Sequence, residues 1–161
     1  MQRQTKLRII GIVVALGLVC ASSVPLYLQK TREERIEYRN DDHTTSVKKA
    51  VQIAKNSHKD TIIVLVRKGC IHCEQAQGAI KAGTRDARQN GLRVLKIDIA
   101  KLDQAQMQKL INDVPGAEIN GGIATPTMID LRSDNGNLKV VRVQRGGTNN
   151  QIKHFFEEAG E

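Results

Sequence analysis

The sequence predicts an α/β domain of three layers, in which a central mixed β-sheet is flanked by helices, preceded by an N-terminal hydrophobic helix. Strand-like and helical stretches alternate between residues 45 and 114, which is typical of parallel strands joined by crossover helices. Asp134-Asn135-Gly136 is a strong hairpin turn and predicts that the last two strands are antiparallel. An apolar run before residue 29 and a charged stretch after it set the N-terminus apart.

The first segment carries an export signal. Three basic residues, Arg3, Lys6 and Arg8, precede an uncharged run from Ile9 to Leu28, and about 20 apolar residues suffice to cross a bilayer. Basic residues before such a run favour a cytoplasmic N-terminus, so the rest of the chain is expected outside the cytoplasm. The competing interpretation is a cleavable signal peptide with its apolar core at 9–19 and a cleavage site near 21–23. Both alternatives export the domain.

These features divide the chain into a signal-anchor or signal peptide (1–28), a charged linker (29–44) and one globular domain (45–161). The formal net charge is +8, and the first 28 residues carry three basic and no acidic groups, which leaves 8 − 3 = +5. This excess fits a solvated basic surface, an anionic membrane or an acidic partner. Aromatic residues make up 2% and Trp is absent, so we expect no nucleic-acid binding.

In the first half of the domain, Thr45 or Ser46 is placed to cap a helix. Its apolar residues recur at helical spacing: Val47, Ala50, Val51 and Ala54. The next stretch, residues 61–66, is continuously apolar and mostly β-branched, which predicts a strand buried on both faces.

A second helix is expected to begin at the cysteine motif and to reach about Gln89, where Asn90-Gly91 forms a left-handed cap. Small residues on one face let this helix lie close to a sheet: Ala76, Ala79, Gly83 and Ala87. A second central strand follows over 92–99. A helix over 102–114 then shows its periodicity through Met107, Leu110 and Ile111, and ends at Pro115-Gly116.

The last third of the chain predicts a hairpin and a closing helix. Its strands are expected at Met128–Leu131 and Leu138–Val143, on either side of the hairpin turn. The final helix is expected over Asn149–Glu158, and its apolar face consists of Ile152, Phe155 and Phe156.

Cys70-Ile71-His72-Cys73 carries the chemistry. The pair follows a predicted strand and opens a helix, where free backbone N–H groups and the helix dipole stabilise a thiolate. Cys70 is therefore the candidate nucleophile, and Cys73 is the candidate resolving thiol. The third cysteine, Cys20, is interpreted as an apolar member of the N-terminal segment. Two cysteines this close are interpreted as a redox-active pair, because a scaffold held together by structural disulfides uses several spaced pairs.

We predict no metal and no cofactor. Covalent haem requires His directly after the second cysteine, and Glu74 stands there. Structural zinc requires four ligands, whereas the other histidines, His43, His58 and His154, are scattered and a second cysteine pair is missing.

Over residues 45–161 the chain resembles the thioredoxin-like superfamily. The resemblance is carried by the strand, the cysteine pair at a helix start, Thr125-Pro126 about fifty residues later, the hairpin and the last helix. It implies that Pro126 follows a cis peptide bond and faces the cysteines. It also implies that Thr125 offers its backbone N–H and C=O to an extended substrate, so that Thr125 and Pro126 form the substrate-binding pair.

The chain departs from cytosolic thioredoxins around the cysteines. Gly69 replaces the usual Trp, Ile71-His72 replaces Gly-Pro, and Val64 stands where a buried carboxylate is usual. A His before the second cysteine resembles the exported, oxidising branch. A protonated His72 beside Cys70 would stabilise the thiolate and make the disulfide more oxidising; alternatively it is an ordinary exposed helix residue.

Four further charged residues are candidates to influence the cysteine pair. Arg67 and Lys68 would add positive potential at the sulfur or lie in a solvated face. Glu74 and Asp98 are placed to replace the missing proton acceptor, and are interpreted first as ordinary polar residues.

The expected function is a thiol–disulfide oxidoreductase of exported proteins, with Cys70, Cys73 and His72 as catalytic residues and oxidase or isomerase activity favoured over reductase. The alternative is a non-catalytic thioredoxin-fold subunit of a cell-envelope or secretion assembly. Expected partners are cysteine-containing exported substrates, a redox partner that recycles the pair, and the membrane. The expected location is periplasmic or extracytoplasmic, tethered to the inner membrane through residues 9–28.

Overall fold

The structure is a computed structural model and describes residues 46–161. The predicted N-terminal hydrophobic helix, the segment 1–28 with Cys20, and the linker 29–44 lie outside the described residues. Among residues 46–161, none of the helices combines the length and apolar character needed to cross a membrane.

The described residues form four strands, four α-helices and one 3-10 turn around one mixed sheet. The elements in order are α2 (Val47–Lys55), β1 (Thr61–Val66), α3 (Ile71–Gln89), β2 (Arg93–Asp98), the 3-10 turn η1 (Ile99–Lys101), α4 (Gln104–Asp113), β3 (Thr127–Asp134), β4 (Asn137–Arg145) and α5 (Asn149–Glu157). The sheet order is β2-β1-β3-β4. Strand β1 is parallel to β2 and antiparallel to β3, and β3 is antiparallel to β4. The predicted mixed sheet is confirmed.

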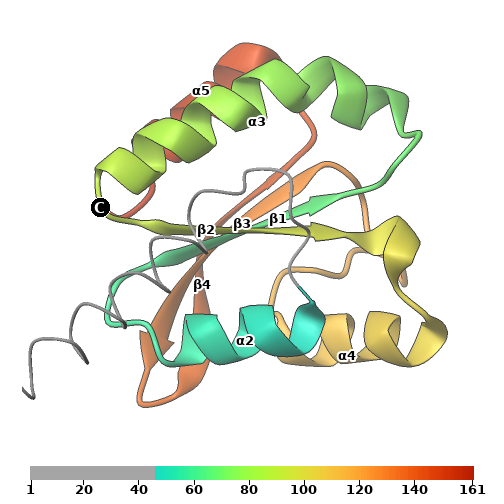
Figure 1. Ribbon diagram of the computed structural model, residues 1–161, viewed down its shortest axis with the longest axis vertical. Coiled ribbons are helices and arrows are strands. Elements are labelled where there is room, and N and C mark those ends of the chain that lie inside the picture. The colour runs from blue at the N-terminus through green and yellow to red at the C-terminus, as the bar shows by residue number, and fades with distance from the viewer. Residues whose placement is uncertain (1–45) are drawn as a thin grey trace, which may run out of the picture. The chain divides into compact units, whose positions relative to one another are not determined.

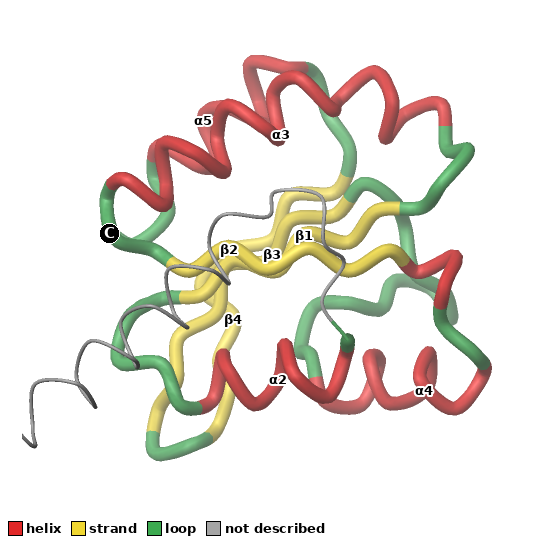
Figure 2. Tube along the Cα trace, viewed as in Figure 1, coloured by secondary structure: helices red, strands yellow, loops and turns green. Residues whose placement is uncertain are grey.

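The sheet separates two helical layers. Helices α2 and α4 cover one face, and α3 and α5 cover the other (Figures 1 and 2). Strand β1 serves both cores because its side chains alternate: Ile63 and Leu65 pack on the α2 side, and Ile62 and Val64 pack on the α3 side. This explains why its sequence is apolar without a break.

Element boundaries differ from the predictions in the middle of the chain. The second strand stops at Asp98 because its carboxylate accepts a hydrogen bond from the Ala100 backbone N–H, which turns the chain into η1. The following helix starts at Gln104 and not at Leu102, because Asp103 and Gln106 form a capping box. The hairpin strands are longer than predicted, since pairing runs up to the two-residue turn at Asn135 and Gly136, both with positive φ.

The topology brings two distant segments together. The end of β1 leads to the cysteine motif, and the start of β3 follows Thr125-Pro126. Because β1 and β3 are antiparallel, these ends lie side by side, with Leu65 paired to Thr127. The cysteine pair therefore faces a loop more than fifty residues away in sequence.

Candidate active site

Cys70 is the N-cap residue of α3. Its backbone is extended, and its sulfur accepts a hydrogen bond from the Cys73 backbone N–H at 3.3 Å. The preceding Gly69 has a φ of 77°, a left-handed conformation that favours glycine and lets β1 turn into the helix. Both cysteines are free thiols; Cys70 is half-buried, whereas Cys73 is 9% exposed. Cys70 is therefore the sulfur that a partner reaches first.

Thr125 contacts the Cys70 sulfur twice. The Cys70 S–H donates to the Thr125 backbone carbonyl at 3.5 Å, and the Thr125 hydroxyl lies 3.5 Å from the same sulfur as a donor. The Thr125–Pro126 bond is cis, which confirms the prediction for Pro126, and this proline is buried. The sequence predicted a backbone role for Thr125 but did not anticipate the contact of its hydroxyl.

The two thiols differ in acidity. The Thr125 hydroxyl and then the Cys73 thiol lower the pKa of Cys70 by hydrogen bonding its sulfur, and the backbone amides of Cys73 and His72 act in the same direction. Burial raises the pKa of Cys73, and so does its hydrogen bond to Cys70. A thiolate on Cys70 with a thiol on Cys73 is the ionised state that this arrangement favours.

His72 is exposed on the first turn of α3, and the contact through which it lowers the Cys70 pKa is its backbone amide. A role for its imidazole stays a prediction. The side chains of Arg67 and Lys68 are exposed. The contacts that these two residues make at the site come from their backbones. The Arg67 carbonyl accepts from the Cys70 N–H at 3.2 Å, and a backbone hydrogen bond from Arg67 lowers the pKa of Cys73.

Asp98 has a positioning role that the sequence did not reveal. The residue is 7% exposed, and its carboxylate accepts hydrogen bonds from the Ala100 N–H at 3.1 Å and from the Lys68 N–H at 3.3 Å. It thereby ties the end of β2 to the loop that leads into Cys70. An Asp at the end of a strand, directly before a tight turn, was the available signal. Glu74 is exposed on the first turn of α3.

Val64 is 1% exposed and lies in the apolar cluster under α3 that also contains Ala76. The position where cytosolic thioredoxins place a carboxylate is therefore part of the apolar core here. Within residues 46–161, no group of three His, Cys, Asp or Glu side chains is arranged to hold a metal ion.

Neither a protein-family model nor a curated protein matches this sequence. Solved structures do match. A thioredoxin of Trichomonas vaginalis is similar with a TM-score of 0.52 and 11% identity, over 72% of this chain and 93% of that one. Thioredoxin f2 of Chlamydomonas reinhardtii is similar with a TM-score of 0.52 and 10% identity, over 71% of this chain and 93% of that one. These likenesses show that the fold is thioredoxin-like, and at this identity they show the fold alone.

Proposed function

We propose that this chain is a thiol–disulfide oxidoreductase that acts on cysteines of exported proteins. The observation that carries the proposal is the Cys70 sulfur, half-buried at a helix start, held by the Thr125 hydroxyl and backed by the buried Cys73 thiol. Low pKa, access from outside and a resolving thiol one turn away are the three properties that disulfide exchange requires.

In the oxidising direction, a substrate thiolate attacks the Cys70 sulfur of the Cys70–Cys73 disulfide. The bond between the two enzyme sulfurs breaks, and Cys73 leaves as a thiolate that takes up a proton. A second substrate thiolate then attacks the substrate sulfur of the mixed disulfide and releases Cys70 as a thiolate. The substrate gains one disulfide and loses two electrons, and the enzyme pair takes up both. In an isomerase, the Cys70 thiolate attacks a substrate disulfide and releases one substrate thiolate. Another substrate thiolate then attacks the substrate sulfur of the mixed disulfide and releases Cys70, with no net transfer of electrons.

Thr125 is proposed to dock the substrate backbone next to the reacting sulfur. In the thiol form its carbonyl accepts the Cys70 S–H. Once Cys70 is a thiolate or part of a disulfide, that proton is gone and the carbonyl is available to a substrate N–H. Substrate docking is thereby coupled to the state of Cys70, with Pro126 fixing the direction of the Thr125 backbone.

Two features favour an oxidase or isomerase over a reductase. Hydrogen bonds that lower the pKa of Cys70 stabilise the reduced form, which makes the disulfide a stronger oxidant. The apolar Val64 supplies no carboxylate to draw the proton from Cys73. A protonated His72 would add to the first effect. The proposed location is extracytoplasmic, on a tether formed by residues 9–28, with a separate redox partner that recycles the pair.

The test is to trap substrates with the Cys73→Ser variant of the full chain. Without the resolving thiol, mixed disulfides through Cys70 should accumulate and disappear on reduction, whereas the Cys70→Ser, Cys73→Ser double variant should give none. A reduction potential well above about −300 mV is expected for a catalytic pair. A lower potential and an absence of adducts from a folded variant would instead favour the non-catalytic envelope subunit.

A further inference from the structure

The outward face of α2 is basic without any acidic residue. Residues 46–59, which include the helix and the turn to β1, contain no Asp or Glu. Their basic side chains are all exposed: Lys48, Lys49, Lys55 and Lys59. The apolar side of the helix faces the core through Val47 and Ala50 among others. The lysines therefore point to the outside of the α2 layer.

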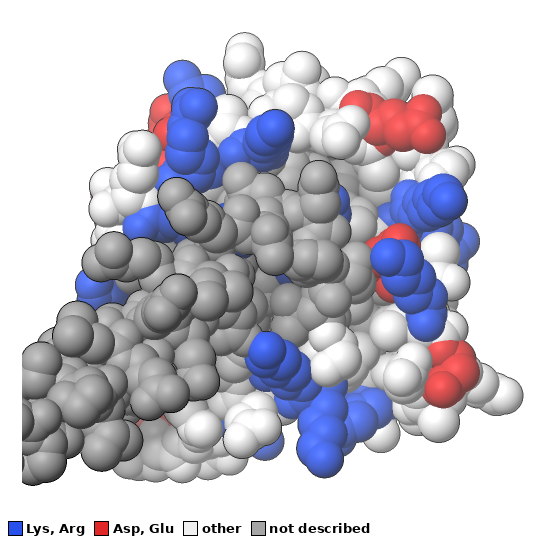
Figure 3. Space-filling view, viewed as in Figure 1, with Lys and Arg blue, Asp and Glu red and all other residues white. Residues whose placement is uncertain are grey.

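The helices across the sheet do not share this pattern. Helix α3 mixes three basic with two acidic residues, and α5 mixes one basic with one acidic residue over Asn149–Glu157. In α5 these form an ion pair, Lys153 with Glu157 at 3.5 Å. Figure 3 shows Lys and Arg side chains in several groups, one of them at the lower edge, near the place where Figure 1 has α2. The unbalanced positive charge thus lies on α2 itself, since α4 in the same layer pairs its Lys109 with Asp113.

We propose that this basic face of α2 seats on an anionic phospholipid surface beside the apolar segment 9–28. The inference rests on the tether in the proposed function. The 17 residues between Leu28 and Ser46 span at most about 60 Å when fully extended, so a tethered domain stays close to the bilayer. At that range even a weak attraction of each lysine to anionic headgroups adds up to docking.

The fold makes this seating compatible with disulfide exchange. Helix α2 lies on the opposite side of the sheet from α3, whose first turn carries the cysteine pair (Figure 2). A domain resting on α2 therefore leaves Cys70 in the layer that faces away from the lipid. Exported substrates would reach the sulfur without displacing the domain.

The test measures lysine acetylation in the full chain, reconstituted into nanodiscs of phosphatidylcholine alone or mixed with phosphatidylglycerol. If about four-fifths of the molecules are docked, Lys48 and Lys55 should react about fivefold more slowly in the anionic discs. Lys81 and Lys153, in the other layer, should react equally in both and serve as internal references. High salt should remove the difference, because it screens exposed charges.

A charge-reversed variant, Lys48→Glu with Lys55→Glu, should lose the protection at Lys59, whereas Lys81→Glu with Lys153→Glu should keep it. If the chain has entered the discs and all lysines react equally in both lipids, the docking is overturned. An acidic protein would then be the favoured partner of the basic face. A chain that enters neither disc would overturn the tether and the docking with it. Neither result bears on trapping by Cys73→Ser.

Discussion

Hydrogen bonds to a single sulfur atom link Cys70 to the first turn of its own helix and to one distant part of the chain. The Cys73 N–H reaches it from the first turn of α3, and the Thr125 hydroxyl reaches it from the loop before β3. Both are donors, so both favour the thiolate over the thiol. The loop that presents Cys70 is in turn held by the carboxylate of Asp98.

The Thr125 hydroxyl can be tested without changing the shape of the side chain. Thr125→Val removes the donor and should raise the Cys70 pKa. Alkylation by iodoacetamide near neutral pH should slow by about tenfold, because a hydrogen bond to a charged acceptor is worth about 1.5 kcal/mol or more. Thr125→Ser keeps the hydroxyl and should restore the rate. An unchanged pH profile in the valine variant would show that this hydroxyl does not stabilise the thiolate.

A matched variant separates the effect of Asp98 on the cysteine pair from the effect of losing an ordinary helix cap. Asp98→Ala removes the acceptor of the Lys68 N–H, and Asp103→Ala removes only the N-cap of α4. Both should lower the free energy of unfolding by about 1 kcal/mol or more. Only Asp98→Ala should also shift the reduction potential of the cysteine pair, measured against glutathione. Equal potentials in the two variants would reduce Asp98 to a structural cap.

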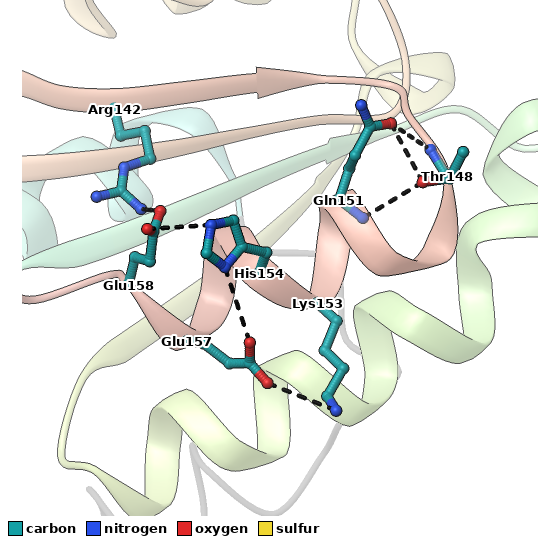
Figure 4. A network of polar contacts seen from close by, with 7 residues as sticks. All are labelled: Arg142, Thr148, Gln151, Lys153, His154, Glu157 and Glu158. Carbon is teal, nitrogen blue, oxygen red and sulfur yellow. Dashed lines mark hydrogen bonds and ion pairs between the residues drawn. The ribbon is translucent and has the colours of Figure 1, made fainter.

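At the scale of elements, α5 is fastened at both ends and packed along its middle. Thr148 and Gln151 form a capping box at its start, and Arg142 of β4 pairs with Glu158 at its end, which also meets His154 (Figure 4). Between them Phe155 and Phe156 pack edge to face, with ring centroids 5.5 Å apart. This helix presses directly on α3, the helix that carries the cysteines.

Two glycines of α3 test that packing. A Cβ on Gly83 would lie 2.2 Å from Cδ2 of Phe156, whereas a Cβ on Gly78 would meet nothing within 4 Å. Gly83→Ala should therefore destabilise the domain by about 1–3 kcal/mol through overpacking. Gly78→Ala should stabilise it by about 0.5–1 kcal/mol through helix propensity. Urea unfolding measures both, and a neutral Gly83→Ala would mean that α5 can move aside.

At the scale of the whole molecule, two groups of titratable residues lie toward opposite ends of β1. The cysteines lie at one end of β1. Toward its other end, Asp60 forms a two-bond ion pair with Arg132, at 2.8 and 2.7 Å. Beside them Asp130 is fully buried on β3. Burial raises the pKa of Asp130, and the nearby charge of Asp60 acts in the same direction.

Asp130 should make the stability of the domain fall as pH rises. A carboxyl whose folded pKa lies above its unfolded value of about 3.9 binds more protons in the folded state. The free energy of unfolding therefore decreases from about pH 4 upward, until the pH passes the folded pKa. Asp130→Asn should flatten that slope and leave the domain more stable at neutral pH. A thermal melt series from pH 4 to 8 checks this, and parallel curves for the two proteins would contradict it.

Local patterns predicted most of the fold. Strand β1 was predicted with its observed ends because an unbroken apolar run of this length fits a strand buried on both faces. The helix ends at Ser46 and Gln89 and the turn at Asn135-Gly136 were predicted from residues with strong local conformational preferences. The ends of β2 and α4 were missed because they depend on side chains that bond the backbone, such as Asp98. Whether such a hydrogen bond forms depends on the distance and angle between side chain and backbone, which the sequence does not give.

The sequence by itself determined the class of fold, the cysteine pair at a helix start and the place of Val64, because periodicity, caps and turns act over a few residues. Only the tertiary structure decided that the Thr125 hydroxyl meets the Cys70 sulfur and that Asp98 holds the loop before it. These contacts join residues 55 and 30 positions apart. Their distances depend on how β1, β2 and β3 pair, and that pairing is fixed by the packing of the whole domain.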